Sequence, residues 1–145
     1  MILHVMRKFL FTIKAFLVAI AVLACIVFLY ILQNSPVFER GERYEFYRGT
    51  SSDEIISVDS PLVKLFLSDI KGESVRYRGD RAEELIERFR ANILFTEEAA
   101  DVVNYYCYSP VLKGGVTLGE YFINLHIAVG REQTAAGTPV IFGGF

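Results

Sequence analysis

Cysteine and histidine are scarce in this chain and tryptophan is absent: its 145 residues include two cysteines and two histidines. Cys25 lies in a long apolar run, so we do not expect it to pair with Cys107, and the fold must depend on a packed core rather than on disulfides. His126 and Cys107 are the only histidine and cysteine after residue 32, which is too few for a typical zinc site. The sequence therefore predicts neither a metal nor a cofactor.

Several common catalytic and phosphate-binding motifs are also missing. The chain contains no G-x-S-x-G, no H-E-x-x-H and no C-x-x-C. Its C-terminal GTPVIFGGF is rich in glycine but lacks the lysine of a phosphate-binding loop, and we expect these glycines to shape the end of a strand. No catalytic residue is assigned, and the chain is predicted not to be an enzyme.

What the chain does have is an uncharged apolar run, residues 15–32 (AFLVAIAVLACIVFLYIL). A helix rises ~1.5 Å per residue, so a run of this length can cross the ~30 Å hydrocarbon core of a lipid bilayer. Apolar residues occupy every face of such a helix and leave it no solvent-facing side, which argues against a buried core helix of a soluble protein. The run is therefore predicted to span the membrane.

Charges beside the run predict its orientation. Arg7, Lys8 and Lys14 precede it, and no lysine or arginine follows it before Arg40. Because basic residues stay on the cytoplasmic side, we expect a single-pass cell membrane protein with its N-terminus in the cytoplasm and its C-terminal part outside. The predicted organisation is a basic tail (1–14), a signal anchor (15–32), a linker (33–42) and an extracytoplasmic domain (43–145).

Two alternatives to an uncleaved anchor stay open. A cleaved signal peptide has an apolar core of ~7–15 residues followed by small residues, whereas this run is longer and ends in Tyr30-Ile31-Leu32. Val22-Leu23-Ala24-Cys25 loosely resembles a lipidation site, but the mature protein would then begin with the apolar residues 26–32.

The part of the chain beyond the run is acidic. The whole chain has 15 basic and 17 acidic residues, and three of the basic ones precede residue 33, which leaves 12 against 17 and a net charge of −5. Nucleic acids and anionic lipids need positive charge to displace their counterions. No nucleic-acid partner is therefore predicted, although Arg76, Arg78, Arg81, Arg88 and Arg90 form a local basic exception.

Hydrophobic periodicity predicts an α+β domain. Residues 43–58 read as a hairpin turning at 49–53, and residues 93–97, 102–109, 122–129 and 138–142 alternate as strands. Residues 81–92 form the clearest helix, with Asp80 as N-cap, Glu83 completing a capping box, and an apolar stripe. Residues 62–70 fit either a helix or a strand. We expect a mainly antiparallel sheet with one face covered by helix 81–92.

The sheet face opposite the helix carries the candidate functional residues. If Tyr106, Tyr108, Asn124 and His126 share this face, they form an aromatic and polar surface suited to a glycan or a peptide. The same tyrosines would equally suit a dry core or an oligomer interface. An alternative pairs His126 with Cys107, or with a nearby carboxylate, as the nucleophilic dyad of an envelope hydrolase.

Three blocks of the second half resemble the YwmB family of Firmicutes. They are Tyr106-Cys107-Tyr108-Ser109-Pro110, Ile123-Asn124-Leu125-His126-Ile127-Ala128-Val129 and Gly137-Thr138-Pro139-Val140-Ile141. The resemblance covers about residues 43–142 and implies an exported or membrane-anchored protein with a fold like that of the TATA-box-binding protein. It also implies an association with endospore formation. It carries over no functional residue and, because fold does not determine function, no DNA binding.

These observations predict a non-enzymatic binding or scaffold domain of the cell envelope, tethered to the lipid bilayer through residues 15–32. Its partner would be an envelope protein or a cell-wall glycan. The alternatives are the hydrolase that uses His126 and a structural oligomer formed through exposed strand edges.

Overall fold

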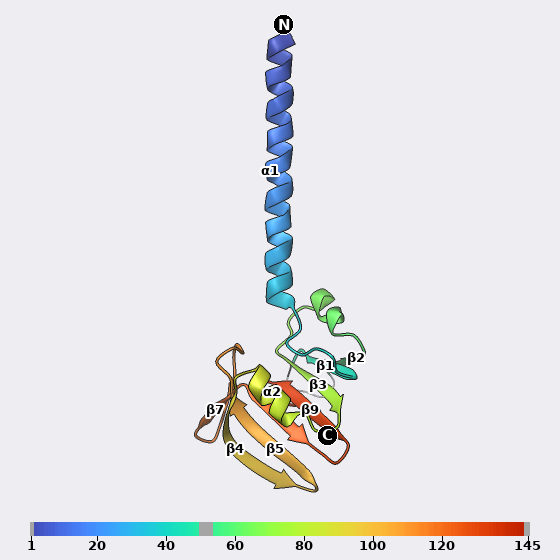
Figure 1. Cartoon of the computed structure of the whole chain (residues 1–145), viewed down its shortest axis with the longest axis vertical. Helices are drawn as coiled ribbons and strands as arrows, with labels where there is room; N and C mark the ends of the chain where they lie inside the picture. The colour runs from blue at the N-terminus through green and yellow to red at the C-terminus, as the bar shows by residue number, and fades with distance from the viewer. Residues whose placement is uncertain (1, 50–53, 144–145) are drawn as a thin grey trace. The chain divides into compact units, whose positions relative to one another are not determined.

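The computed structural model describes residues 2–49 and 54–143. The chain forms two units, Met1–Ser35 and Pro36–Phe145. The first is a single helix, and the second is a domain of strands and short helices (Figure 1).

Helix α1 (Ile2–Asn34) contains the predicted membrane-spanning run. Neither glycine nor proline occurs within it, and its part Phe9–Asn34 is long and apolar enough to cross a membrane, with none of its apolar stretch buried. The side chains of Asn34 and Ser35 donate hydrogen bonds of 2.9 and 2.6 Å to the carbonyls of Tyr30 and Ile31. These bonds satisfy carbonyls that lack partners at the end of a helix, just before Pro36.

Seven strands form one antiparallel sheet in the order β2-β1-β3-β9-β8-β5-β4. They are β1 (Arg43–Tyr47), β2 (Ile55–Val58), β3 (Gly72–Arg78), β4 (Asn92–Ala99), β5 (Val102–Tyr108), β8 (Leu125–Val129) and β9 (Gln133–Thr138). A separate small sheet pairs β6 (Val116–Leu118) with β7 (Tyr121–Ile123). The predicted α+β class with a mainly antiparallel sheet is confirmed.

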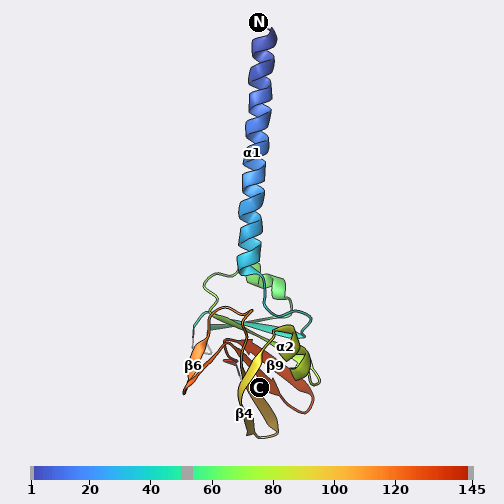
Figure 2. The same cartoon turned by 60° about the vertical axis from the view of Figure 1, so that its left-hand side comes forward.

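Helix α2 (Ala82–Arg88) covers one face of the sheet, as predicted (Figure 2). Leu85 belongs to the apolar stripe of this helix, and Phe89 is the first residue after the helix ends. Both are buried in one core with Leu125 and Ile127 of β8. Burying each such side chain stabilises the fold by about 1.5–3 kcal/mol. The amphipathic pattern read from the sequence therefore holds this helix on the sheet.

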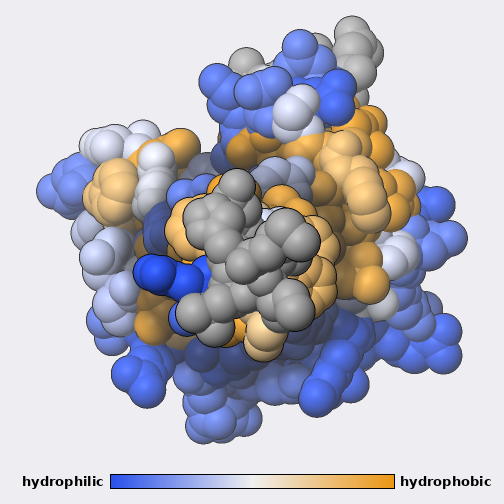
Figure 3. Space-filling view, turned by 90° about the horizontal axis from the view of Figure 1, so that it is seen from above, coloured by the Kyte–Doolittle hydropathy of each residue, from blue (hydrophilic) through white to orange (hydrophobic). Residues whose placement is uncertain are grey.

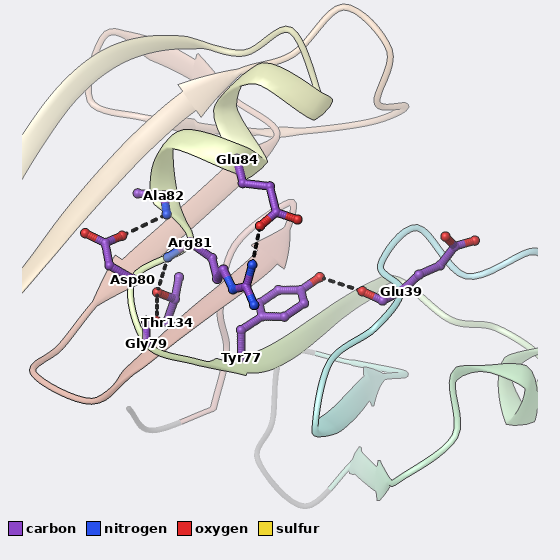
Figure 4. Close-up of polar contacts among 8 residues, drawn as sticks. All are labelled: Glu39, Tyr77, Gly79, Asp80, Arg81, Ala82, Glu84 and Thr134. Atoms are coloured by element: carbon purple, nitrogen blue, oxygen red, sulfur yellow. Dashed lines mark hydrogen bonds and ion pairs between the residues drawn. The ribbon is translucent and has the colours of Figure 1, made fainter.

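A small polar cluster fixes the start of α2 (Figure 4). The Thr134 hydroxyl accepts a hydrogen bond from the Arg81 N–H (3.0 Å) and donates one to the Gly79 carbonyl (2.7 Å). The Asp80 carboxylate accepts the Ala82 N–H at 2.9 Å. Asp80 thus stabilises the first turn as expected, but the N-cap position itself is Arg81, and Glu83 completes no capping box there.

Helix α2 is shorter than the predicted 81–92. It ends at Arg88, Arg90 takes a left-handed backbone conformation with φ 48°, and Asn92 already begins β4. The apolar pattern extends past Arg88 because Phe89 still packs in the core after the helix has ended. The strand that follows is therefore longer than predicted.

Strands β4 and β5 are joined by a two-residue turn, in which Ala100 and Asp101 both have positive φ. Two-residue turns of this kind are common in hairpins because their backbone twist matches the twist of the two strands.

Two strand predictions near the C-terminus are wrong. The run 122–129 is interrupted at Asn124, which separates β7 from β8. The last strand is residues 133–138 rather than 138–142, so it begins five residues earlier than predicted. Glycine is needed at position 137 of β9 because the following segment returns across it: a Cβ there would lie 2.8 Å from backbone atoms of Val140 and Ile141.

The N-terminal boundary of the domain also differs from the prediction. Most of the expected linker 33–42 belongs to the domain, which begins at Pro36. Phe38 is 1% exposed and packs edge-to-face against Phe89, with ring centroids 5.6 Å apart. The Glu42 N–H donates to the Arg76 carbonyl at 2.8 Å. This segment is irregular, as expected, but it is part of the core.

The structure also defines the predicted hairpin 43–58 and the ambiguous segment 62–70. The hairpin 43–58 is confirmed by the pairing of β1 with β2, although the middle of its predicted turn, residues 50–53, lies outside the described residues. The ambiguous segment 62–70 contains a short 3₁₀ helix, η2 (Pro61–Phe66), with proline at its start.

Candidate recognition surface

Aromatic side chains form a stack on the sheet face opposite α2. Tyr106 of β5 lies opposite Phe95 of β4 and His126 of β8 in the strand register. Its ring centroid is 4.3 Å from that of Phe95 and 4.5 Å from that of His126, with interplanar angles of 15° and 12°. Because the three residues come from neighbouring strands, both faces of the Tyr106 ring are covered. Tyr121 of β7 tilts over Phe95 at 5.3 Å and extends the group.

His126 is the most buried member of the stack, at 9% exposure. The Ile141 N–H lies 3.4 Å from its Nδ1, which assigns Nδ1 as the acceptor, and Nε2 then donates to Asn104 Oδ1 at 3.1 Å. Burial lowers the pKa of His126 from 6.5 to about 4. The imidazole is therefore neutral at physiological pH and acts as a stacked, hydrogen-bonded ring.

Tyr106 is held by a polar contact with Glu97 as well as by stacking. Burial raises the pKa of its phenol, and a hydrogen bond and charge from Glu97 raise it further. Since Glu97 lies two residues beyond Phe95 on the same strand, β4 provides both a stacking ring and a polar partner for Tyr106. The stack is thus fixed by three strands.

More exposed rings border this stack. Tyr108, Tyr121 and Phe122 are all exposed, the last at 49%, and the Tyr108 and Phe122 rings lie 6.3 Å apart. We define the aromatic surface as these three residues together with Phe95, Tyr106 and His126. Phe95, Tyr121 and Phe122 were not among the predicted residues. The adjacent aromatic pair Tyr121-Phe122 is a signal in the sequence, but the alternation of residues 122–129 predicts one continuous strand that begins at Phe122.

Asn124 does not join the aromatic surface. Asn124 is 1% exposed, and its side-chain amide binds backbone groups. Its Oδ1 accepts the Ser109 N–H at 2.7 Å, and its Nδ2 donates to the carbonyls of Ser109 and Leu112 at 2.8 and 3.2 Å. These side-chain hydrogen bonds take the place of backbone pairing at the break between β7 and β8. Of the four predicted surface residues, the structure therefore brings Tyr106, Tyr108 and His126 to one face and places Asn124 in a structural role.

The structure does not bring Cys107 and His126 together. Cys107 lies opposite Leu125 in the register and is fully buried in the core beneath α2, whereas His126 faces the other side of the sheet. Burial raises the pKa of the Cys107 thiol to about 11, so little thiolate forms at neutral pH. The nearest polar partner of His126 is the amide of Asn104 rather than a carboxylate.

A second polar cluster on the same face is also structural. Tyr47 Oη lies 2.6 Å from Ser74 Oγ and donates to Glu45 Oε2 at 3.0 Å. Burial raises the pKa of Tyr47, and the Gly143 N–H donates to its oxygen at 3.3 Å while the Phe142 ring packs against it. This cluster fastens the C-terminal segment onto β1 and β3.

Comparisons with protein-family models, with curated proteins and with solved structures find no match to this chain. The resemblance to the YwmB family, and the fold that it implies, therefore stay predictions.

Proposed function

We propose that this protein is a membrane-anchored, non-enzymatic binding domain of the cell envelope. The anchor would be α1, whose apolar part is long enough to cross a bilayer. The basic residues Arg7, Lys8 and Lys14 at its start, and the lack of any lysine or arginine between it and Arg40, support a cytoplasmic N-terminus and an external domain.

The aromatic surface is the observation that carries the binding role. Tyr108, Tyr121 and Phe122 are exposed, and each contacts another ring: Tyr121 lies 5.3 Å from Phe95 of the stack, and Tyr108 and Phe122 lie 6.3 Å apart. Exposed aromatic residues of this kind are enriched at protein interfaces.

An extended segment of a partner protein fits this surface better than a glycan does. Strand β4 is an edge of the seven-stranded sheet among the described strands, and it carries Phe95 beside the exposed rings. An edge strand offers backbone groups that an incoming segment can pair with, while neighbouring rings receive its side chains. Sugars stack on open ring faces, and the faces of Tyr106 are covered by Phe95 and His126.

Site-specific photocrosslinking in cells tests this proposal. A benzophenone amino acid replaces Phe122 in the full chain, and a matched control carries it at Glu84, an exposed residue of α2 on the other face. We expect a discrete adduct with a different polypeptide at position 122 only, and we expect Tyr108→Ala to weaken it.

Four outcomes would contradict the proposal that a segment of a partner protein binds the aromatic surface. An adduct with the mass of two copies would instead indicate an oligomer formed through strand edges, and one removed by a wall-degrading muramidase would indicate a glycan ligand. Equal adducts at positions 122 and 84, or none, would show that the aromatic surface has no specific partner.

The resemblance to the YwmB family adds one expectation to this proposal. It favours a role in spore formation or envelope maintenance, and this predicts that the neighbouring genes belong to sporulation or wall synthesis. Neighbours from a metabolic operon would remove that support without touching the binding role.

A further inference from the structure

The short helix η2 exposes two large apolar side chains. Phe66 is 87% exposed, more than any other large apolar residue of the described chain, and Leu62 is 59% exposed. Leu67 and Ile70 follow and pack against the core, so η2 is attached to the domain while these two side chains are directed outward. Single exposed apolar residues are common, and their position must decide whether this pair has a role.

A buried carboxylate ties η2 to the segment that follows α1. The Lys64 ammonium of η2 lies 2.6 Å from Glu73 Oε2. The other oxygen of Glu73 accepts the backbone N–H groups of Val37 and Phe38, the latter at 3.1 Å. Figures 1 and 2 both show η2 at the end of the domain where the chain arrives from residue 36. The exposed apolar pair therefore belongs to the end of the domain through which the chain leaves toward α1.

Chain length limits the distance between Val37, whose backbone Glu73 holds in the domain, and the end of α1. Only Ser35 and Pro36 separate Asn34, the last residue of α1, from Val37. A fully extended chain covers about 3.3–3.6 Å per residue, so the three steps from Asn34 to Val37 reach about 10 Å at most. If α1 spans a bilayer, Val37 and Phe38 therefore stay close to the lipid headgroups, and η2 is tied to these two residues through Lys64 and Glu73.

We infer that Leu62 and Phe66 insert into the interface of the bilayer that α1 spans, so that η2 is a lipid-binding element of the domain. This inference rests on the proposed anchoring by α1. Apolar side chains at the rim of a membrane-bound domain bury themselves at the boundary between headgroups and acyl chains. Figure 3 shows hydrophobic residues exposed among hydrophilic ones on the surface of the chain.

The interaction would be apolar rather than electrostatic. The exposed charges that flank η2 have both signs, Asp59 and Asp69 against Lys71, and Lys64 is already paired with Glu73. Attraction to anionic lipid needs clustered basic residues and weakens in salt. We therefore expect insertion in neutral phosphatidylcholine, with little change when salt or anionic lipid is added.

The absence of tryptophan from the chain provides a direct test. Three single variants of the full chain are placed in phosphatidylcholine nanodiscs: Phe66→Trp, Leu23→Trp inside the span, and Ala99→Trp at the β4–β5 turn, which Figures 1 and 2 place at the opposite end of the domain from η2. Fluorescence is compared between ordinary lipid and lipid brominated near the top of its acyl chains. We expect Phe66→Trp and Leu23→Trp to show blue-shifted emission that brominated lipid quenches, and Ala99→Trp to show neither effect.

The variants separate the failure of this inference from the failure of the anchor. Quenching of Leu23→Trp without quenching of Phe66→Trp would leave the anchor intact and overturn the lipid-binding role of η2. Blue-shifted but unquenched emission from Phe66→Trp would also overturn it, because protein rather than lipid would then cover η2. Absence of quenching at Leu23→Trp would refute the anchor itself.

Discussion

Replacing His126 with glutamine should remove a specific part of the pH dependence of stability. The imidazole has a pKa of about 4 in the folded protein, because burial disfavours its charged form, against 6.5 when exposed. Between these values the unfolded chain binds a proton that the folded chain does not, so the folded state loses stability as the pH falls. One pH unit corresponds to about 1.4 kcal/mol, and the gap from 6.5 to 4 therefore corresponds to a loss of about 3 kcal/mol. The full stability is present above about pH 6.5 and is lost progressively down to about pH 4.

The assay compares the free energy of unfolding of wild type and His126→Gln across this window, with the full chain in detergent micelles and urea as denaturant. Other titrating groups affect both proteins alike, so we expect the stability advantage of wild type to shrink by about 3 kcal/mol between about pH 7.5 and about pH 4. A constant difference would refute the reasoning, because His126 would then have the same pKa in both states. A His4→Gln variant leaves His126 as the single histidine for a direct NMR titration, which should show no change until the pH approaches 4.

Three further substitutions test the packing by urea denaturation. Phe38→Ala should cost about 3–5 kcal/mol, because it opens a cavity in the core; a cost below 1 kcal/mol would show that the segment before β1 is a free linker. Asn124→Ala should cost about 1–3 kcal/mol for each backbone group of Ser109 that loses its partner, and a neutral effect would contradict its structural role. Glu73→Gln should cost about 3–5 kcal/mol, because the Lys64 ammonium stays largely buried without its counterion; a cost like that of a surface ion pair would show that water screens this contact.

The hydrophobic pattern of the sequence was sufficient to predict helix α1 and the face of α2 that packs on the sheet. The uncharged run 15–32 predicts its own helix, and the stripe that includes Leu85 and Phe89 predicts which side of α2 faces the sheet. Alternation along the strands allows Tyr106 and His126 to share the sheet face away from α2, and the structure stacks them there.

The errors come from contacts between residues distant in sequence. Phe38 looks like part of a polar linker, and its place in the core is set by Glu73, which binds the backbone before β1 from a different strand. In β9 the contact is closer in sequence: Gly137 leaves room for the backbone of Val140 and Ile141, and alternation of residues does not reveal this return of the chain. Asn124 alternates correctly for a strand, yet its amide bonds to Ser109 and Leu112 interrupt that strand. No local rule specifies such partners.

The central claim is that a domain held by α1 works outside the cytoplasm, and labelling in intact cells tests it most directly. Glu98→Cys places a thiol on the exposed end of β4, while the buried Cys107, whose pKa is raised to about 11, stays unreactive in the folded chain. The unsubstituted chain is the control. We predict that a membrane-impermeant maleimide labels Glu98→Cys in intact cells. Labelling that appears only after the cells are lysed would place the domain in the cytoplasm and contradict the account.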